Sequence, residues 1–244
     1  MRLLNPKEKC ATLTHMESNA LWPQGPDYKG ESIQTDALCL AHFVRAPRGA
    51  LCADLGTGCG ILPLLLLWER DDLRFHAVEL RESAALSAKE NMERNGFAEH
   101  CSVYIGDARE APLERGKYDL VVSNPPYFPA DASCGDEERK TMRQESMSLS
   151  ELCTLASGLL KNGGRFTLCY PASRFAELTV ALEAAKLRVK RLRCVQHSAG
   201  HAPSLLLCES RKNAGAGLQW EPPLLIRGED GQETEEYKKI CHWE

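Results

Sequence analysis

The chain has 244 residues, of which 43% are hydrophobic and 26% are charged, the composition of an ordinary globular protein. Its longest apolar run, residues 61–68, is too short to span a bilayer, and the opening residues MRLLNPKEKC lack the apolar core of a secretory signal, so we expect a cytoplasmic protein without a membrane partner. The net charge of −4 resides entirely in residues 221–244, which hold seven acids and three bases, so it excludes neither nucleic acid nor protein partners.

Apolar runs typical of strands alternate with helix-like segments from about residue 50 onward. Before them, ESIQTDALCLAHFVR has apolar residues at helical spacing and predicts a helix. The expected strands span residues 50–55, 73–80, 101–106, 118–124, 165–170, 191–197 and 204–210. The expected helices span about 59–69, 81–95, 148–161 and 172–186. This order predicts an α/β fold, Rossmann-like and doubly wound, with a mostly parallel seven-stranded sheet whose last two strands form an antiparallel pair at one edge.

We expect a single domain over residues 1–244, because neither an internal repeat nor a second core is evident. It would comprise a helical lead-in (1–48), the α/β core (49–212) and a C-terminal arm (213–244) with an extended stretch, a charged turn and a short helix. The eleven cysteines form no C-x-x-C pair, so we expect buried, reduced thiols and no metal site.

The first chemical motif is ADLGTGCGIL, where the first strand ends and a helix begins. Gly56, Gly58 and Gly60 let the backbone approach a ligand closely, and the helix start offers unpaired N–H groups. A dinucleotide site would need glycine where Ile61 stands, and Asp54 would repel a phosphate. The pattern favours a nucleoside that carries a sulfonium and an amino acid; a plain tight turn is the alternative.

Two acids follow the next strands. Glu79 ends the second strand at the position where, in doubly wound folds, an acid binds ribose hydroxyls. Asp107, in YIGDAR, follows the third strand and can accept the exocyclic amino group of adenine. By itself Asp107 could equally cap the following turn.

The motif SNPPYF follows the fourth strand, at the edge where ligands bind in open α/β sheets. The side-chain oxygen of Asn124 and the carbonyl of Pro125 could accept both hydrogens of a planar amino group, since the prolines fix the corner. That would orient the amine lone pair and stabilise the positive charge that develops on nitrogen. Tyr127, after Pro126, offers a flat face for stacking. A structural Pro-Pro turn is the alternative.

DLGTGCG and SNPPYF together resemble the cofactor motif and the catalytic [N/D]-P-P-[Y/F] motif of class I S-adenosylmethionine-dependent methyltransferases, over roughly residues 30–210. The resemblance implies S-adenosyl-L-methionine as the cofactor and a target amine held by Asn124, Pro125, Pro126 and Tyr127. The cofactor-binding residues it implies are Asp54, Leu55, Gly56, Thr57, Gly58, Gly60, Glu79, Asp107, Ala108 and Asn124.

A narrower resemblance is to the bacterial valine-tRNA adenine-N6 methyltransferase family, through QTDALCLAHFV, NPPYF, ERKTMRQE and EPPLLIRGEDGQETEEYKKI. It implies methylation of N6 of an adenosine in the anticodon loop of valine tRNA, with RNA as the partner and no DNA. Members of that family tend to carry Ala-Arg-His-Glu after NPPYF. This chain departs from that pattern and has Met142, Arg143, Gln144 and Glu145 there, which bears on the exact substrate.

Three other functions share parts of this pattern. Release-factor glutamine methyltransferases use the same corner, since a glutamine amide is also a planar amino group, but they usually carry a helical N-terminal domain for which there is little room here. Ribosomal RNA guanine-N2 methyltransferases are a second alternative, and many of those carry a duplicated domain. A non-catalytic RNA-binding scaffold would be expected to lose Asp54 or Asn124, and both are present.

For RNA recognition we expect Arg139, Lys140 and Arg143, beside the NPPY corner. A second candidate is KLRVKRLR, residues 186–193, which holds five bases and no acid. A solvated strand entry is the alternative for that stretch. The oligomeric state stays open.

Overall fold

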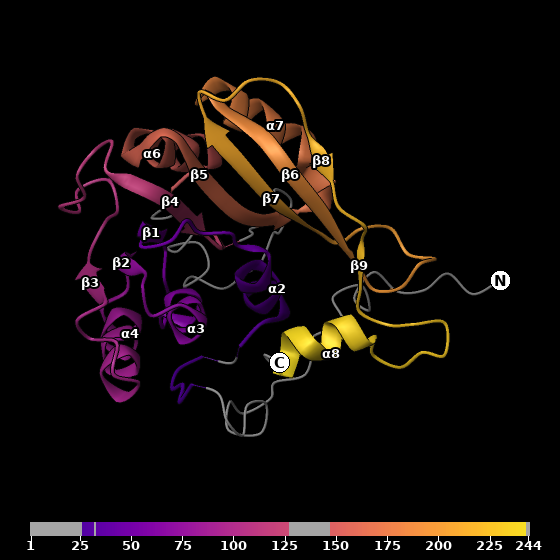
Figure 1. The fold of residues 1–244 in the computed structure, drawn as a ribbon, viewed down its shortest axis with the longest axis horizontal. Helices are drawn as coiled ribbons and strands as arrows, with labels where there is room; N and C mark the ends of the chain where they lie inside the picture. Colours follow the sequence, from indigo (N-terminus) through magenta and orange to yellow (C-terminus); the bar gives the residue numbers. More distant parts are fainter. Residues whose placement is uncertain (1–25, 32, 127–146, 243–244) are drawn as a thin grey trace, which may run out of the picture.

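The computed structural model describes residues 26–31, 33–126 and 147–242 of the chain (Figure 1). The residues of the site and of RNA recognition that the sequence suggested but that lie outside these ranges are Tyr127, Arg139, Lys140, Met142, Arg143, Gln144 and Glu145.

Strands and helices alternate as the sequence predicts. The helices are α2 (Thr35–Phe43), α3 (Ile61–Glu69), α4 (Glu82–Arg94), α6 (Leu149–Leu159), α7 (Phe175–Ala184) and α8 (Glu235–His242), with a short 3-10 turn, η2 (Ala172–Arg174). The strands are β1 (Leu51–Leu55), β2 (Arg74–Glu79), β3 (Cys101–Ile105), β4 (Tyr118–Ser123), β5 (Leu160–Pro171), β6 (Leu187–Gln196), β7 (Leu205–Lys212), β8 (Gln219–Trp220) and β9 (Leu224–Leu225).

The sheet has the order β3-β2-β1-β4-β5-β7-β6-β8, and β9 also pairs with β6. Strands β3, β2, β1, β4 and β5 are parallel, whereas β7 runs antiparallel to both β5 and β6. The Rossmann-like fold with an antiparallel edge pair is thus confirmed. All seven predicted strands are present, but the sheet has nine strands. The two additional strands, β8 and β9, are two residues long, which is too short for a periodic pattern to reveal them.

Helices cover both faces of this sheet (Figure 1). One hydrophobic core gathers side chains of α2, α3 and α8, among them Leu40, Leu65 and Ile240. The other gathers side chains of α6 and α7, among them Leu159 and Leu178. Helix α3 is apolar on nearly every side because it lies between the sheet, α2 and α4, so it has no solvated face to keep polar.

None of the nine cysteines among the described residues forms a disulfide, and eight of them are buried. Within the same residues, no cluster of His, Cys, Asp or Glu side chains could hold a metal ion. Among the described residues, none of the helices has the length and apolar character that a membrane crossing requires.

The basic stretch that enters β6 is largely held by protein groups. Arg191 is buried, with 5% of its surface exposed. The ion pairs of the stretch are Arg188–Glu183 (3.0 Å), Arg191–Glu209 (2.7 Å) and Arg193–Glu236 (2.7 Å). Lys190 donates to the carbonyl of Ala216 (2.9 Å). A fully solvated strand entry therefore does not describe this stretch.

Gly60 supplies a test of how α3 packs on α4. Its φ is +81°, and a Cβ there would lie 3.0 Å from the Cβ and 3.2 Å from the Cα of Ala88 on α4. We expect Gly60→Ala to lower the free energy of unfolding by about 2–4 kcal/mol, from left-handed strain plus overpacking. The control is Gly163→Ala, with φ +76° and no atom within 4 Å, which should lose only about 1–2 kcal/mol. Urea titration of both variants measures the difference, and equal losses would contradict the helix contact.

Candidate cofactor and target-amine site

A cavity of about 470 Å³ opens where β1, β2, β3 and β4 end. This carboxyl edge is where open α/β sheets bind their ligands. The predicted site residues in its lining are Leu55, Gly56, Thr57, Gly58, Glu79, Asp107, Ala108, Asn124, Pro125 and Pro126. Two predicted residues, Asp54 and Gly60, do not line the cavity.

Hydrogen bonds join the glycine turn to the end of β2. The backbone amides of Gly56 and Thr57 donate to the carbonyl of Val78 at 2.9 and 3.0 Å, and the amide of Gly58 donates to Oε2 of Glu79 at 2.8 Å. Gly56 and Gly58 have φ values of +79° and +56°, and a Cβ on either would meet no protein atom within 4 Å. The turn therefore needs glycine for its conformation and leaves open space on its cavity side.

Glu79 holds a second group as well as the turn. Its Oε1 accepts from the backbone amide of Arg81 at 3.0 Å and from the Nε of the same residue at 3.3 Å. Arg81 in turn pairs with Glu31 at 2.7 Å. Only 7% of the surface of Glu79 is exposed. Burial and these hydrogen bonds together fix the orientation of its carboxylate at the cavity wall.

Asp54 is a buried carboxylate without a normal partner. It is completely buried, and neither of its oxygens accepts a hydrogen bond of normal geometry from the described residues. Burial raises the pKa of Asp54 to about 7, an effect that the hydroxyl of Thr57 partly offsets and the charge of Glu79 increases. A buried carboxyl group without a hydrogen-bond partner of normal geometry is unfavourable, and a cationic ligand beside the glycine turn would offset that cost.

Asp36 is a site residue that the motif analysis did not single out. It lies in the first turn of α2, is 9% exposed and lines the cavity. Its Oδ1 accepts from the amide of Ala37 at 2.7 Å, and its carboxyl group also shares a side-chain hydrogen bond with Asn124. Burial raises the pKa of Asp36, whereas the bond to Asn124 lowers it.

The direction of that last bond orients the amide of Asn124. A carboxylate only accepts hydrogen bonds, so the amide nitrogen of Asn124 faces Asp36. The side-chain oxygen of Asn124 is then directed away from Asp36. The one sequence signal for Asp36 is a lone acid inside the apolar helix TDALCLAHF, and that signal alone does not point to a site.

Asp107 closes a local turn and also lines the cavity. Its Oδ1 accepts from the backbone amide of Arg109 at 2.8 Å, which closes the local turn, and its carbonyl accepts from Glu110 and Ala111. The guanidinium of Arg109 lowers the pKa of Asp107. Asp107 nevertheless lines the cavity, so it serves the turn and faces the ligand space together.

Comparison with known proteins shows which family the chain matches and which proteins it resembles. The sequence model of the methyltransferase small domain matches residues 32–191. The tRNA1(Val) (adenine(37)-N6)-methyltransferase of Photorhabdus laumondii subsp. laumondii is 31% identical over 88% of this chain and 89% of that protein. The protein of the same name from Porphyromonas gingivalis (strain ATCC BAA-308 / W83) is 30% identical over 78% of this chain and 77% of its own.

Solved structures support the fold alone. A predicted O-methyltransferase from Agrobacterium tumefaciens superposes with a TM-score of 0.70 at 19% identity and covers 84% of this chain and 95% of that one. Geranyl diphosphate C-methyltransferase from Streptomyces coelicolor A3(2), solved with S-adenosyl-L-homocysteine, superposes with a TM-score of 0.53 at 13% identity, covering 72% and 78%.

The family match identifies an S-adenosylmethionine-dependent methyltransferase, and the fold agrees with it. More narrowly, the chain belongs to the methyltransferase small domain family, in which its relatives are named tRNA1(Val) (adenine(37)-N6)-methyltransferases.

The residues of the cavity fit this cofactor. S-adenosylmethionine carries a sulfonium and an ammonium group, and a cation beside the glycine turn would favour the ionised form of Asp54, whose pKa is raised by burial. The hydroxyl of Thr57 is also buried without a partner of normal geometry among the described residues, and Thr57 lines the cavity. The open side of the turn at Gly56 and Gly58 leaves room for a ligand to approach the backbone.

The raised pKa of Asp54 predicts how stability depends on pH. Because the folded chain binds this proton more tightly than the unfolded chain, the stability that protonated Asp54 contributes falls as pH rises from 3.8 to about 7 and is lost above that. Asp54→Asn removes the titration. We therefore expect the melting temperature of Asp54→Asn to exceed that of wild type by a margin that grows across this window, measured by calorimetry without cofactor.

The same variant should bind the cofactor about tenfold more weakly, a change of roughly 1.4 kcal/mol, because an amide does not balance a cation. Isothermal titration with S-adenosylmethionine measures this. Parallel stability curves for the two proteins, or equal affinities, would contradict the assigned environment of Asp54.

Proposed function

We propose that the protein transfers a methyl group from S-adenosyl-L-methionine to N6 of an adenosine in the anticodon loop of valine tRNA. The observation that carries the proposal is the corner at Asn124 and Pro125, which lies on the wall of the cofactor cavity with its amide oriented by Asp36. The name shared by the relatives supports adenine N6 as the target.

In this proposal the cofactor lies along the carboxyl edge of the sheet. Glu79 binds the ribose hydroxyls, and Asp107 with Ala108 binds the adenine ring. Leu55, Gly56, Thr57 and Gly58 contact the methionine part. Asp54 contributes its charge from behind the turn, and Gly60 lets α3 approach α4 without touching the ligand. When bound, the cofactor supplies an electrophilic methyl group on a positively charged sulfur.

The chain's own residues prepare the amine. The side-chain oxygen of Asn124 and the carbonyl of Pro125 accept the two hydrogens of the target amino group, which directs the nitrogen lone pair toward the methyl donor. The same two acceptors stabilise the positive charge that develops on nitrogen. The amine becomes acidic only as it is methylated, so its proton leaves late and to solvent, and no side-chain general base is assigned. Tyr127 would stack on the base.

Further properties follow from this assignment. The chain acts as one methyltransferase domain, which is supported by β8 and β9 of the arm joining the same sheet as the core strands. It acts in the cytoplasm, where its cysteines stay reduced; those among the described residues form no disulfide. RNA is its macromolecular partner, and DNA and membranes are not.

The decisive test is methyl transfer from labelled S-adenosylmethionine into bacterial tRNA that lacks the modification, followed by nucleoside analysis. Wild type should produce N6-methyladenosine, and Asn124→Ala should reduce kcat by about 10²–10³-fold, the cost of removing one positioned transition-state acceptor. Release factor and ribosomal RNA are offered in parallel. Cofactor binding without label in tRNA would overturn the tRNA assignment, and label in release factor would replace it with glutamine methylation.

Asp36 should act on the rate by orienting Asn124. We expect Asp36→Ala to lower kcat by about 10–10²-fold with little change in KM, because the amide of Asn124 loses the group that holds it. Asp36→Asn keeps an acceptor oxygen and should recover most of the rate. The acidic limb of the kcat–pH profile should lie above the usual range of an aspartate in wild type and be absent in Asp36→Asn.

The matched control for Asp36 is Thr35→Val. Thr35 is also buried at the start of α2, where its hydroxyl is 3.0 Å from that of Tyr237, and it does not line the cavity. It should lose stability but keep kcat. Equal loss of rate in Thr35→Val and Asp36→Ala would assign the effect to the helix start and not to Asn124.

A further inference from the structure

A second cavity, of about 490 Å³, lies between β5, β6, β7 and the segment that follows α2, and residues 217–219 also line it. We call it the cationic cavity, because five of its lining residues are basic and one is acidic. The basic residues are Arg45, Arg165, Lys190, Arg191 and Arg211, and the acid is Glu209. The cavity is separate from the cofactor cavity, with which it shares no lining residue.

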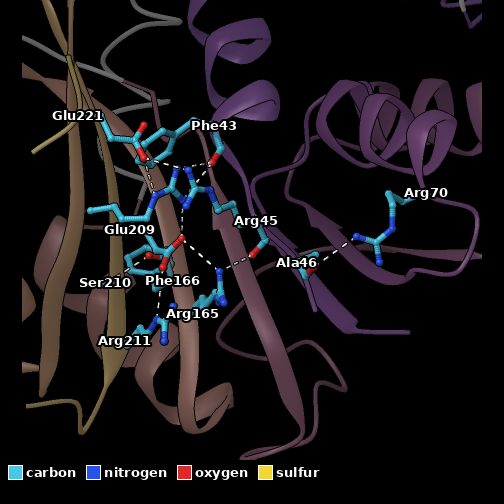
Figure 2. A network of polar contacts seen from close by, with 11 residues as sticks. Phe43, Arg45, Ala46, Arg70, Arg165, Phe166, Glu209, Ser210, Arg211 and Glu221 are labelled. Carbon is cyan, nitrogen blue, oxygen red and sulfur yellow. Dashed lines mark hydrogen bonds and ion pairs between the residues drawn. The ribbon is translucent and has the colours of Figure 1, made fainter. Parts of the chain in front are cut away.

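Glu209 is the buried centre of this arrangement, as the dashed contacts in Figure 2 show. It is fully buried and accepts from Nη1 of Arg191 at 2.7 Å and from Nε of Arg211 at 3.3 Å, while Arg165 lies 3.5 Å away. Glu221, beside the cavity, accepts from Arg191 at 2.9 Å and from Arg45 at 3.2 Å. Four guanidinium groups thus contact two carboxylates, while Lys190 donates to the carbonyls of Gly215 and Ala216.

Arg191 belongs to the framework of the protein. Its guanidinium donates to Glu209, to Glu221 and to the carbonyl of Phe43, and it lies 4.2 Å from the centre of the Phe43 ring. It is therefore bonded on all sides, and it holds the end of α2 against β6. Substituting Arg191 would therefore report on the stability of the fold and not on ligand binding.

Arg165 and Arg211 keep much of their donor capacity. A guanidinium has five N–H donors. In the described part of the chain, Arg211 uses its Nε toward Glu209, and Arg165 uses its Nη1 toward the carbonyl of Arg45 and toward Glu209. The remaining donors of both residues are available for an anion in the cavity.

The surroundings of Arg165 show the excess of positive charge. Burial lowers the pKa of its guanidinium, and the charges of Arg211, Arg191 and Arg45 lower it further, against the opposite effect of Glu209. Several guanidinium groups that repel one another around one carboxylate are stabilised when a further anion enters.

We propose that the cationic cavity binds a phosphate group of the RNA backbone. Guanidinium forks match the geometry of phosphate oxygens, and a phosphate would balance the excess charge. The assignment of the phosphate to RNA rests on the proposed function, because a free phosphate has the same chemistry.

Helix α2 connects this cavity to the reaction site. Asp36, near its start, lines the cofactor cavity, and Phe43, at its end, accepts from Arg191. These two residues are about 10 Å apart along the helix axis at about 1.5 Å per residue. An RNA whose target base lies at Asn124 and whose backbone follows α2 would place the phosphate of another nucleotide in the cationic cavity.

The test compares two double variants that remove the same charge. Arg45→Gln with Arg211→Gln removes two cavity bases whose side chains are 57% and 38% exposed, and it leaves Arg191 to pair with both acids. The control is Arg94→Gln with Arg174→Gln, at 41% and 33% exposure, neither of which lines the cavity. Arg211→Gln alone serves if the cavity double variant does not fold.

Affinity for unmodified valine tRNA transcript is measured by fluorescence anisotropy over a range of KCl concentrations. The cavity variant should bind about tenfold more weakly near 0.1 M salt, and its slope of log affinity against log salt should fall by about 1, as for the loss of one phosphate contact. The control should stay within about twofold of wild type on the same scale. Both double variants should remain folded, and their cofactor affinity should stay unchanged.

Equal weakening in both double variants would assign the effect to overall charge and overturn the proposal. If tRNA affinity is unchanged while inorganic phosphate raises the melting temperature of wild type alone, the cavity binds a free anion and the RNA assignment fails. No response to either probe would leave the network purely structural, which also overturns it. Binding is measured without methyl transfer, so a tRNA that binds here but is not methylated would count against the proposed function alone.

Discussion

The attachment of the glycine turn to the end of β2 is the constraint on which the site depends. Two amides of the turn donate to Val78 and a third to Glu79, so the chain leaving β1 must follow a left-handed path. Only glycine adopts that path without strain, and its missing side chain leaves the space in which a cofactor can lie. The same turn starts α3 and brings it against α4 at Gly60. The cofactor cavity and the packing of two helices thus arise from one local geometry.

Three buried acids show how differently the fold treats negative charge. Glu209 is surrounded by guanidinium groups, and Asp36 accepts from a backbone amide and bonds to Asn124. Asp54 alone has no partner of normal geometry within the described residues. Burial without compensation is unfavourable, and it is found beside the glycine turn, where a cation is expected. Such local conflicts with stability are characteristic of functional positions.

The sequence predicted most of what depends on neighbours along the chain. The apolar runs located the seven long strands, and the glycines and the Asn-Pro-Pro corner located two walls of one cavity. It did not reveal Asp36, because the contact with Asn124 joins α2 to the end of β4, and nothing in either segment specifies the other. The sequence showed a basic stretch in β6 but not the acid that pairs with it. That acid, Glu209, pairs with Arg191 from the neighbouring strand β7. Pairing across strands is set by the register, which composition does not contain.

Helix α2 gives this arrangement its rigidity. Eight of its nine residues are buried, and it contacts α3, α8, β5 and β7, so it cannot shift without disturbing both the sheet and the C-terminal arm. A helix with no solvated face is held by packing on all sides. Helix α2 therefore fixes the position of Asp36 at one end relative to the Phe43 carbonyl at the other. If one RNA reaches both cavities, helix α2 and not a loop sets the distance between its target base and the bound phosphate. A substrate with a different backbone path would occupy only one of the two cavities at a time.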